Sequence, residues 1–131
     1  MQFVKMHGAG NDYIFIDCLD SPRPDSPEQL ALLLSDRHRG IGSDGLILIE
    51  PDDIAAARMS MWNADGTPGE MCGNGLRCLA SYLFQQGHCR ETRFTVATDT
   101  PAAAARSGMV GRFIVAPSYQ NASSAALDDT L

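Results

Sequence analysis

The sequence is 131 residues long, is 44% hydrophobic and carries a formal net charge of −6. That length and apolar content are enough for one domain with a buried core, and the lack of any run of about 18 apolar residues argues against a membrane partner. The acidic charge, with only 10 scattered Lys and Arg residues, argues against nucleic acid and is compatible with a neutral or zwitterionic small molecule.

The first predicted elements are two strands and a helix. Residues 2–8 alternate between apolar and polar side chains, and residues 13–18 are rich in β-branched and aromatic ones. A helix over 28–36 follows, with Ser26 suited to its N-cap and Pro27 suited to its first position. Its predicted apolar stripe consists of Leu30, Leu33 and Leu34.

The next segment, "GIGSDG" at 40–45, matches the letters of the dinucleotide-binding loop G-x-G-x-x-G. That loop follows a strand and opens a helix, whereas here a predicted helix precedes it and a predicted strand follows. A pyrophosphate would therefore find no helix N-terminus. We interpret the segment as a tight turn that uses the φ freedom of glycine.

The remaining predicted elements are four strands and one helix. The strands cover residues 45–50, 57–63, 92–98 and 111–116. The helix follows Cys72 and ends near Gly87, and its apolar residues at helical spacing are Leu76, Leu79, Ala80, Leu83 and Phe84. Strands outnumber helices and connect closely, which predicts an α+β domain over 1–116 with a disordered or divergent tail over 117–131.

Cys72 is the leading candidate for chemistry. A cysteine in the first turn of a helix faces unpaired backbone N–H groups and the positive end of the helix dipole, and both favour the thiolate. Gly73 and Gly75 would let a ligand approach the backbone closely, at some cost in helix stability. Bare N–H groups there could hold a carboxylate or the oxygen of an enolate-like transition state.

Other interpretations of Cys72 stay open at this point. Free cysteine is commonly a buried small apolar residue. A zinc site would need ligand pairs such as C-x-x-C, whereas Cys72 and Cys78 are six residues apart, so no metal is expected. A Cys–His–Asn nucleophile would need His7 or His38 as its base, although no spacing favours it.

The redox state of the cysteines follows from the start of the chain. "MQFVKMHGAGNDY" lacks the basic, apolar and small-residue regions of a secretory signal. The four cysteines, Cys18, Cys72, Cys78 and Cys89, are therefore interpreted as reduced thiols, and a cytoplasmic location is expected.

Three blocks carry the most specific signal: "MQFVKMHGAGNDYIFID", "DRHRGIGSDGLILIE" and "WNADGTPGEMCGNGLRCLA". In order and spacing they resemble the N-terminal half of diaminopimelate epimerase, a member of the cofactor-independent epimerase and racemase superfamily. The likeness runs from Met1 to Thr98. It implies an α+β domain in which an antiparallel sheet wraps around a central helix, paired with a second, similar domain across the substrate cleft.

The resemblance also implies a mechanism. A thiolate from one domain removes the α-proton of the amino acid, and a thiol from the other delivers a proton to the opposite face, without pyridoxal phosphate or metal. This agrees with the need for an acid and a base on opposite faces of an inverting stereocentre. The implied reaction is the conversion of LL-diaminopimelate to meso-diaminopimelate, a step of lysine and cell-wall precursor biosynthesis.

Carried over by position, Cys72 matches the catalytic cysteine of the family's first domain. Gly73 and Asn74 match the groups that hold the reacting end of the substrate. Asn11 and Asn63 match residues that hydrogen-bond it, since an amide can both donate and accept. At Gly45 some members carry a Gln that contacts substrate, and this chain departs from them there.

The family's second domain, with its partner cysteine, has no counterpart in this sequence, and after Thr98 the chain departs from the family. Three hypotheses follow. The chain is an incomplete epimerase, a homodimeric racemase in which Cys72 of two copies meets across a two-fold axis, or a non-catalytic remnant that binds a carboxylate. Turn geometry is the simpler interpretation of Asp65 and Gly66.

Overall fold

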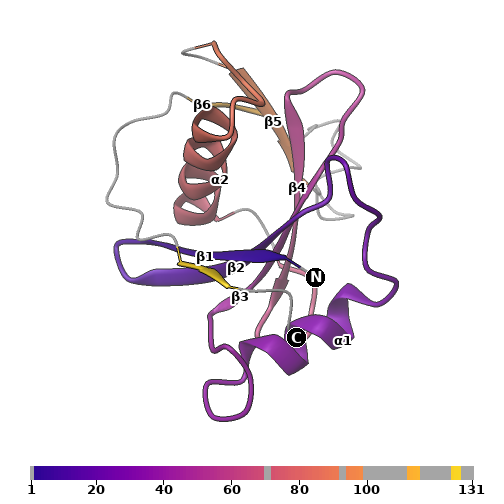
Figure 1. The fold of residues 1–131 in the computed structure, drawn as a ribbon, viewed down its shortest axis with the longest axis vertical. Coiled ribbons are helices and arrows are strands. Elements are labelled where there is room, and N and C mark those ends of the chain that lie inside the picture. The colour runs from indigo at the N-terminus through magenta and orange to yellow at the C-terminus, as the bar shows by residue number, and fades with distance from the viewer. Residues whose placement is uncertain (1, 70–71, 92–93, 99–111, 116–124, 128–131) are drawn as a thin grey trace, which may run out of the picture.

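The computed structural model describes residues 2–69, 72–91, 94–98, 112–115 and 125–127 (Figure 1). Its elements are β1 (Phe3–Gly8), β2 (Asn11–Asp17), α1 (Pro27–Ser35), β3 (Gly45–Glu50), β4 (Ala57–Asn63), α2 (Gly73–Gln85), β5 (Phe94–Thr98), β6 (Arg112–Val115) and β7 (Ala125–Leu127). None of the described helices is long and apolar enough to cross a membrane.

All the strands belong to one sheet, in the order β6-β5-β4-β3-β2-β1-β7. The predicted α+β class is confirmed, but the sheet is mixed where an antiparallel one was expected. β2 runs parallel to β3 and β4 runs parallel to β5, whereas the other neighbours are antiparallel. Parallel neighbours need a crossover connection, and α1 and α2 lie in those two crossovers.

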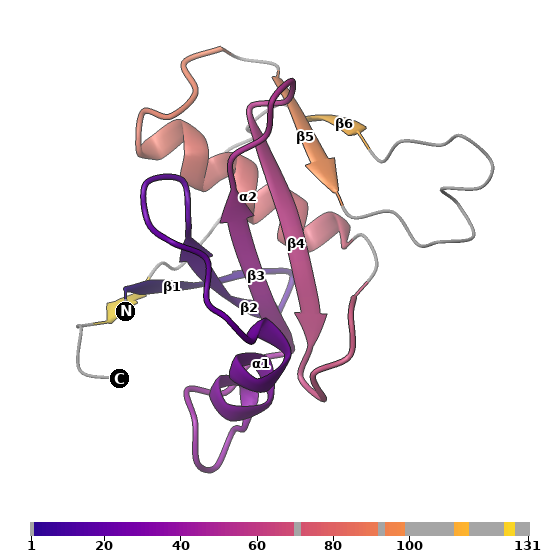
Figure 2. The ribbon, with the colours of Figure 1, turned by 90° about the vertical axis from the view of Figure 1, so that its right-hand side faces the viewer.

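The two helices cover opposite faces of the sheet (Figure 2). Alternation along β2 turns Tyr13 and Phe15 toward the α2 side and Ile14 toward the α1 side. β3 is buried along its whole length because a helix covers each of its faces. Figure 1 shows the sheet curving around α2, from β1 and β2 at one side to β5 and β6 at the other. The expected central helix is therefore α2.

Both helices differ from the predicted apolar stripes at single positions. α1 turns Ala31 and Leu34 to the sheet and leaves Leu33 65% exposed. Leu30 and Leu34 of the predicted stripe do pack on the core beneath this helix, so Leu33 is the position that departs from it. On α2, Phe84 is 45% exposed although the adjacent Leu83 is fully buried.

The start of α1, the 40–45 segment and the predicted tail can also be compared with their predictions. Ser26 is the N-cap of α1, with Pro27 in its first turn, and the 40–45 segment joins that helix to β3 with Gly42 at φ +85°. Of the predicted 117–131 tail only 125–127 is described, as a strand paired with β1, and the rest lies outside the described residues.

Candidate active site

The predicted site residues gather at one end of the sheet, on the face covered by α2. β2 begins at Asn11 and β3 at Gly45, and β4 ends at Asn63. The register places Tyr13 opposite Gly45, and Gly45 opposite Asn63. α2 begins at this same end, because Asn11 contacts its N-cap residue, Cys72.

Cys72 adopts an extended conformation, φ −119° and ψ 117°, immediately before the first turn of α2. Its carbonyl accepts the first helical bond, from the N–H of Leu76 at 2.9 Å. Its side chain is half-buried, and the amide Nδ2 of Asn11 donates to its sulfur at 3.3 Å. Cys72 is thus only partly buried, and it also packs against the core under α2.

The start of α2 carries bare backbone donors. Within the described residues no side chain caps the helix, and its first turn contains no acidic residue. Gly73 is exposed, and no described neighbour lies within 4 Å of the position that a Cβ would take. The N–H groups of a first helical turn lack partners within the helix. This end of the helix is consequently open to an anionic group of a ligand.

Gly75 differs from the expectation that it lets a ligand approach the backbone. It is buried, and a Cβ there would lie 2.7 Å from Cδ1 of Ile47 and 3.7 Å from the ring of Tyr13. Its lack of a side chain lets the helix approach the sheet. Of the two glycines expected to admit a ligand, only Gly73 faces open space.

Asn74 and Asn63 have partners of their own. Asn74 Oδ1 accepts a hydrogen bond from Arg77, and its Cβ lies close to Gly8 at the end of β1. Asn63 is exposed, and its Nδ2 donates to Oγ1 of Thr67 at 3.0 Å in the turn that contains Gly66. The structure thus brings Asn11, Cys72 and Asn74 to one place, while the Asn63 amide is engaged in the adjoining turn.

An ionic cluster fixes the loop beside the site. Arg37 donates through both terminal nitrogens to Asp12, at 2.7 and 3.2 Å, and also to Asp44 at 3.1 Å. Lys5 contacts Asp12 at 3.1 Å. The Arg37 hydrogen bonds hold the pKa of Asp12 well below its usual range. The cluster ties the loop before β3 to the start of β2, next to Asn11.

Tyr13 is the site residue that sequence reasoning missed. Burial, with a smaller contribution from Cys72, raises the pKa of its phenol. The available signal was its position two residues after Asn11 in a strand, which puts both side chains on one face. Its aromatic character was used only as evidence for the strand.

Of the remaining cysteines, Cys18 and Cys78 are buried, whereas Cys89 is half-buried like Cys72 but follows the end of α2. Burial, followed by the charge of Glu50, raises the pKa of Cys18 to about 11. Burial also raises the pKa of Cys78, on the core side of α2. All four cysteines are free, and no group of three or more His, Cys, Asp and Glu side chains in the described part of the chain could hold a metal ion.

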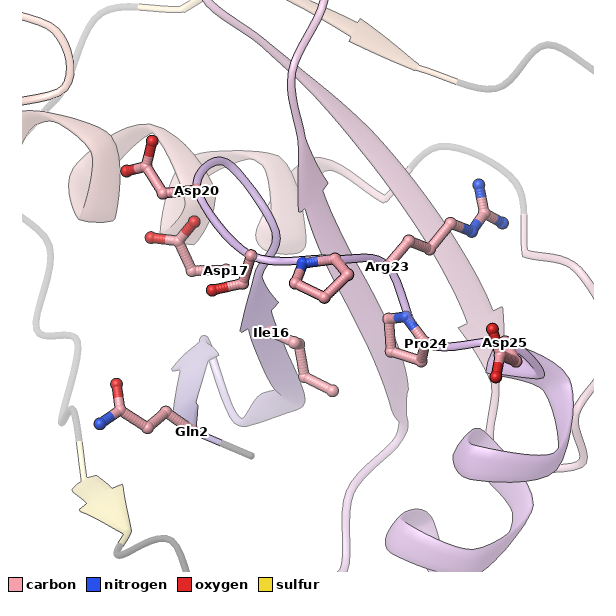
Figure 3. Close-up of a pocket in the computed structure, with 9 residues that line it drawn as sticks. Gln2, Ile16, Asp17, Asp20, Arg23, Pro24 and Asp25 are labelled. Carbon is pink, nitrogen blue, oxygen red and sulfur yellow. The ribbon is translucent and has the colours of Figure 1, made fainter.

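A cavity of about 640 Å³ lies at the far end of β2, lined by Gln2, Ile16, Asp17 and residues 20–25 (Figure 3). Asn11 begins β2 and Asp17 ends it, so the length of the strand, about 20 Å, separates this cavity from Cys72. No cysteine is among the described residues that line it. Its position and chemistry both set it apart from the candidate site.

A model of the family described as diaminopimelate epimerase matches residues 3–102. The chain belongs to the diaminopimelate epimerase family. It is 48% identical over 98 residues to diaminopimelate epimerase of Agathobacter rectalis, covering 75% of this chain and 34% of that protein. The enzyme of the same name from Methanococcus maripaludis is 45% identical over 98 residues, covering 75% of this chain and 35% of that one.

A solved structure extends the likeness to the fold. A hydroxyproline epimerase from Agrobacterium vitis matches with a TM-score of 0.53 and 19% identity, over 88% of this chain and 37% of that chain. At that identity the match bears on the fold alone. This member of the diaminopimelate epimerase family spans about a third of the length of the curated relatives it matches.

Proposed function

We propose that this chain provides one half of a diaminopimelate epimerase site, in which the thiolate of Cys72 removes the α-proton of LL-diaminopimelate and leads to the meso form. The observation that supports this most directly is a half-buried sulfur at an uncapped helix start, held by Asn11 at 3.3 Å. The family relationship supports the choice of reaction.

The α-proton of an amino acid is only weakly acidic, so its removal depends on stabilising the negative charge that develops on the carboxyl oxygens. The N–H groups in the first turn of α2 are donors fixed in advance, beside the sulfur and accessible at Gly73. Asn74 lies in that first turn, where its amide can supplement the backbone donors. Cys72 and the helix start are thus suited to act as base and oxyanion donor together.

Inversion also needs an acid on the opposite face of the α-carbon. In the proposed enzyme that acid is a second thiol, supplied by another domain or by Cys72 of a second copy. Cys18 and Cys78 are poor candidates for it because both are buried. Under this proposal the substrate is a free amino acid, and no cofactor takes part in the proton transfer.

The direct test is loss of the α-proton signal when the chain is incubated with LL-diaminopimelate in D₂O and followed by NMR. We expect exchange with the parent chain and none with Cys72→Ser, because a serine hydroxyl is far too weak an acid to ionise there. Cys78→Ser is the matched control on the same helix and should retain exchange. Absence of exchange together with saturable binding of diaminopimelate would favour a carboxylate-binding remnant instead.

A further inference from the structure

Arg77 is an exposed cation on α2 whose guanidinium donates to Oδ1 of Asn74. Side chains three and four positions apart on a helix lie next to each other. None of the neighbours of Arg77 at those spacings is acidic: they are Gly73, Asn74, Ala80 and Ser81. A cation near the start of a helix also gains nothing from the helix dipole, which favours anions there. In the described part of the chain, Asn74 is thus the polar group that Arg77 binds.

The chemistry of this contact fixes the orientation of the Asn74 amide. A guanidinium has N–H donors and no acceptor, so the atom of Asn74 that faces it is the carbonyl oxygen. The amide nitrogen, Nδ2, then lies on the other side of the planar group, away from Arg77. Among the described residues Nδ2 has no hydrogen-bond acceptor. Its two protons are therefore left for a ligand.

The end of β1 holds the same side chain from another direction. A Cβ at Gly8 would lie 3.2 Å from Cβ of Asn74 and 3.4 Å from its Oδ1, so Asn74 packs closely on this glycine and is half-buried. Gly8 pairs with Asn11, which donates to the sulfur of Cys72. The amide of Asn74 is consequently held at the end of the sheet where Cys72 lies.

We propose that Arg77 is a positioning residue for Asn74: it occupies the amide oxygen, so that Nδ2 is left to donate to a carboxylate of the substrate. The inference rests on the proposed function for the identity of that ligand. With its oxygen engaged, Asn74 acts as a donor, which suits a carboxylate and disfavours an ammonium group. The bare N–H groups of the first turn of α2 have the same preference. Arg77 adds a positive charge from the next turn of the helix.

The orientation of the amide can be measured without turnover, by NMR of the ¹⁵N-labelled chain. The Nδ2 signals of Asn74 are identified by their loss in Asn74→Ala, and their heteronuclear NOE reports rigidity on the picosecond-to-nanosecond timescale. We expect the parent value to approach that of the α2 backbone amides. Arg77→Met keeps an aliphatic stem and removes the donors. In this variant the value should fall to that of an exposed side-chain amide such as Gln86.

Two further variants control for charge and for the substitution itself. Arg77→Lys keeps a positive charge and an N–H donor, so it should restore most of the rigidity of the Asn74 amide. Arg90→Met makes the same change at an exposed arginine beyond the far end of α2, whose side chain has no described partner. The Asn74 signals of Arg90→Met should equal those of the parent. Thermal melting checks that each variant retains the fold.

Titration with diaminopimelate gives the functional readout. If Nδ2 donates to a substrate carboxylate, its signals should shift on binding. Arg77→Met should raise the dissociation constant about fivefold, within the effect of one hydrogen bond, and Arg90→Met should leave it unchanged. A dissociation constant that stays at the parent value in Arg77→Met, although the amide has become mobile, would overturn the link between Arg77 and the substrate.

An Asn74 amide that is equally rigid in the parent and in Arg77→Met would overturn the inference, because packing on Gly8 would then be sufficient to hold it. An equal loss of rigidity in Arg77→Lys and Arg77→Met would also overturn it, since the donor would not be the cause. The proton-exchange assay decides the proposed function separately. A parent chain without exchange would refute the enzyme and leave the mobility result standing, whereas exchange with an unchanged amide would do the reverse.

Discussion

At the start of α2, two glycines in the same helical turn have opposite surroundings. Gly73 faces open space, whereas Gly75 is pressed against Ile47. Sequence reasoning treated them alike, because both lack a side chain and both lie beside Cys72. In the structure the first lies in open space and the second is packed between helix and sheet.

This contrast predicts opposite outcomes for two alanine substitutions. Gly73→Ala should leave the free energy of unfolding unchanged or raise it by about 0.5 kcal/mol, because Ala favours helix and nothing obstructs its methyl group. Gly75→Ala should lower it by about 1 kcal/mol, because its methyl group would lie 2.7 Å from buried Ile47, beyond what helix propensity offsets. Urea unfolding of both variants provides the measurement.

The substitutions Gly73→Ala and Gly75→Ala also distinguish an effect on substrate binding from an effect on the stability of the fold. If the N–H groups at Gly73 receive the substrate, Gly73→Ala should slow α-proton exchange at least about tenfold while the fold stays intact. Exchange at the parental rate in Gly73→Ala would contradict the role given to that backbone position. Gly75→Ala serves as the comparison in which packing is altered two residues further along the same turn.

Among the elements, the loop between α1 and β3 is attached to β2 by charge. Arg37 joins Asp12 to Asp44, and backbone bonds run from the Asp44 N–H to the Asp12 carbonyl and from the Asp12 N–H to the Asp44 carboxylate. The segment that has the letters of a nucleotide-binding loop is thus a structural connection. It holds Gly45 opposite Tyr13, so that the ring of Tyr13 packs against this glycine.

The depressed pKa of Asp12 makes part of this attachment dependent on pH. A carboxyl whose pKa is lower in the folded chain contributes stability above its unfolded pKa, about 3.9, and that stability is lost as the pH falls through the folded value. We expect Asp12→Asn to lower the free energy of unfolding by about 1 kcal/mol at pH 7, since one partner, Arg37, is half-exposed. At pH 2 the difference in the free energy of unfolding between Asp12→Asn and the parent chain should be smaller.

Urea titrations at pH 7, 4 and 2 measure this effect. Asp53→Asn, which changes an exposed carboxylate away from the cluster, controls for the general loss of a negative charge. A gap between Asp12→Asn and the parent that stays constant over this range would show that the cluster contributes through packing alone.

On the scale of the whole molecule, one candidate base lies on one sheet face, whereas inversion needs two groups on opposite faces of the substrate. The chain spans about a third of the length of the curated relatives it matches. Among the described residues the other half-buried thiol is Cys89, which follows the far end of α2 from Cys72. Under the proposed function, the source of the second group decides whether the chain only exchanges the α-proton or inverts the stereocentre.

This leads to a stereochemical prediction. A monomer with Cys72 alone should exchange the α-proton of LL-diaminopimelate for deuterium from one face, with little meso product. A homodimer that joins two Cys72 sites should form meso product at a rate that rises with protein concentration. Sedimentation and chiral chromatography on the same samples give the two measurements. Meso product from a sample that sediments only as monomer would contradict this account of the second group.

The sequence by itself determined the α+β fold class, the positions of most helices and strands, and the place of Cys72 at the start of a helix. Those features depend on local properties: side-chain period, Pro27 at the start of a helix, and the order of helix, glycine loop and strand. The three sequence blocks further indicated the family, which the match over residues 3–102 confirmed.

Tertiary structure alone decided the surroundings of each residue. The side of α1 that faces the sheet, the parallel pairs and the packing of Gly75 depend on how distant segments meet, which no local pattern encodes. The contact of Cys72 with Asn11 joins a strand to a helix some 60 residues later in the chain. Hydrogen bonds to a sulfur act over a few ångströms, so only the folded sheet could show which donors reach it.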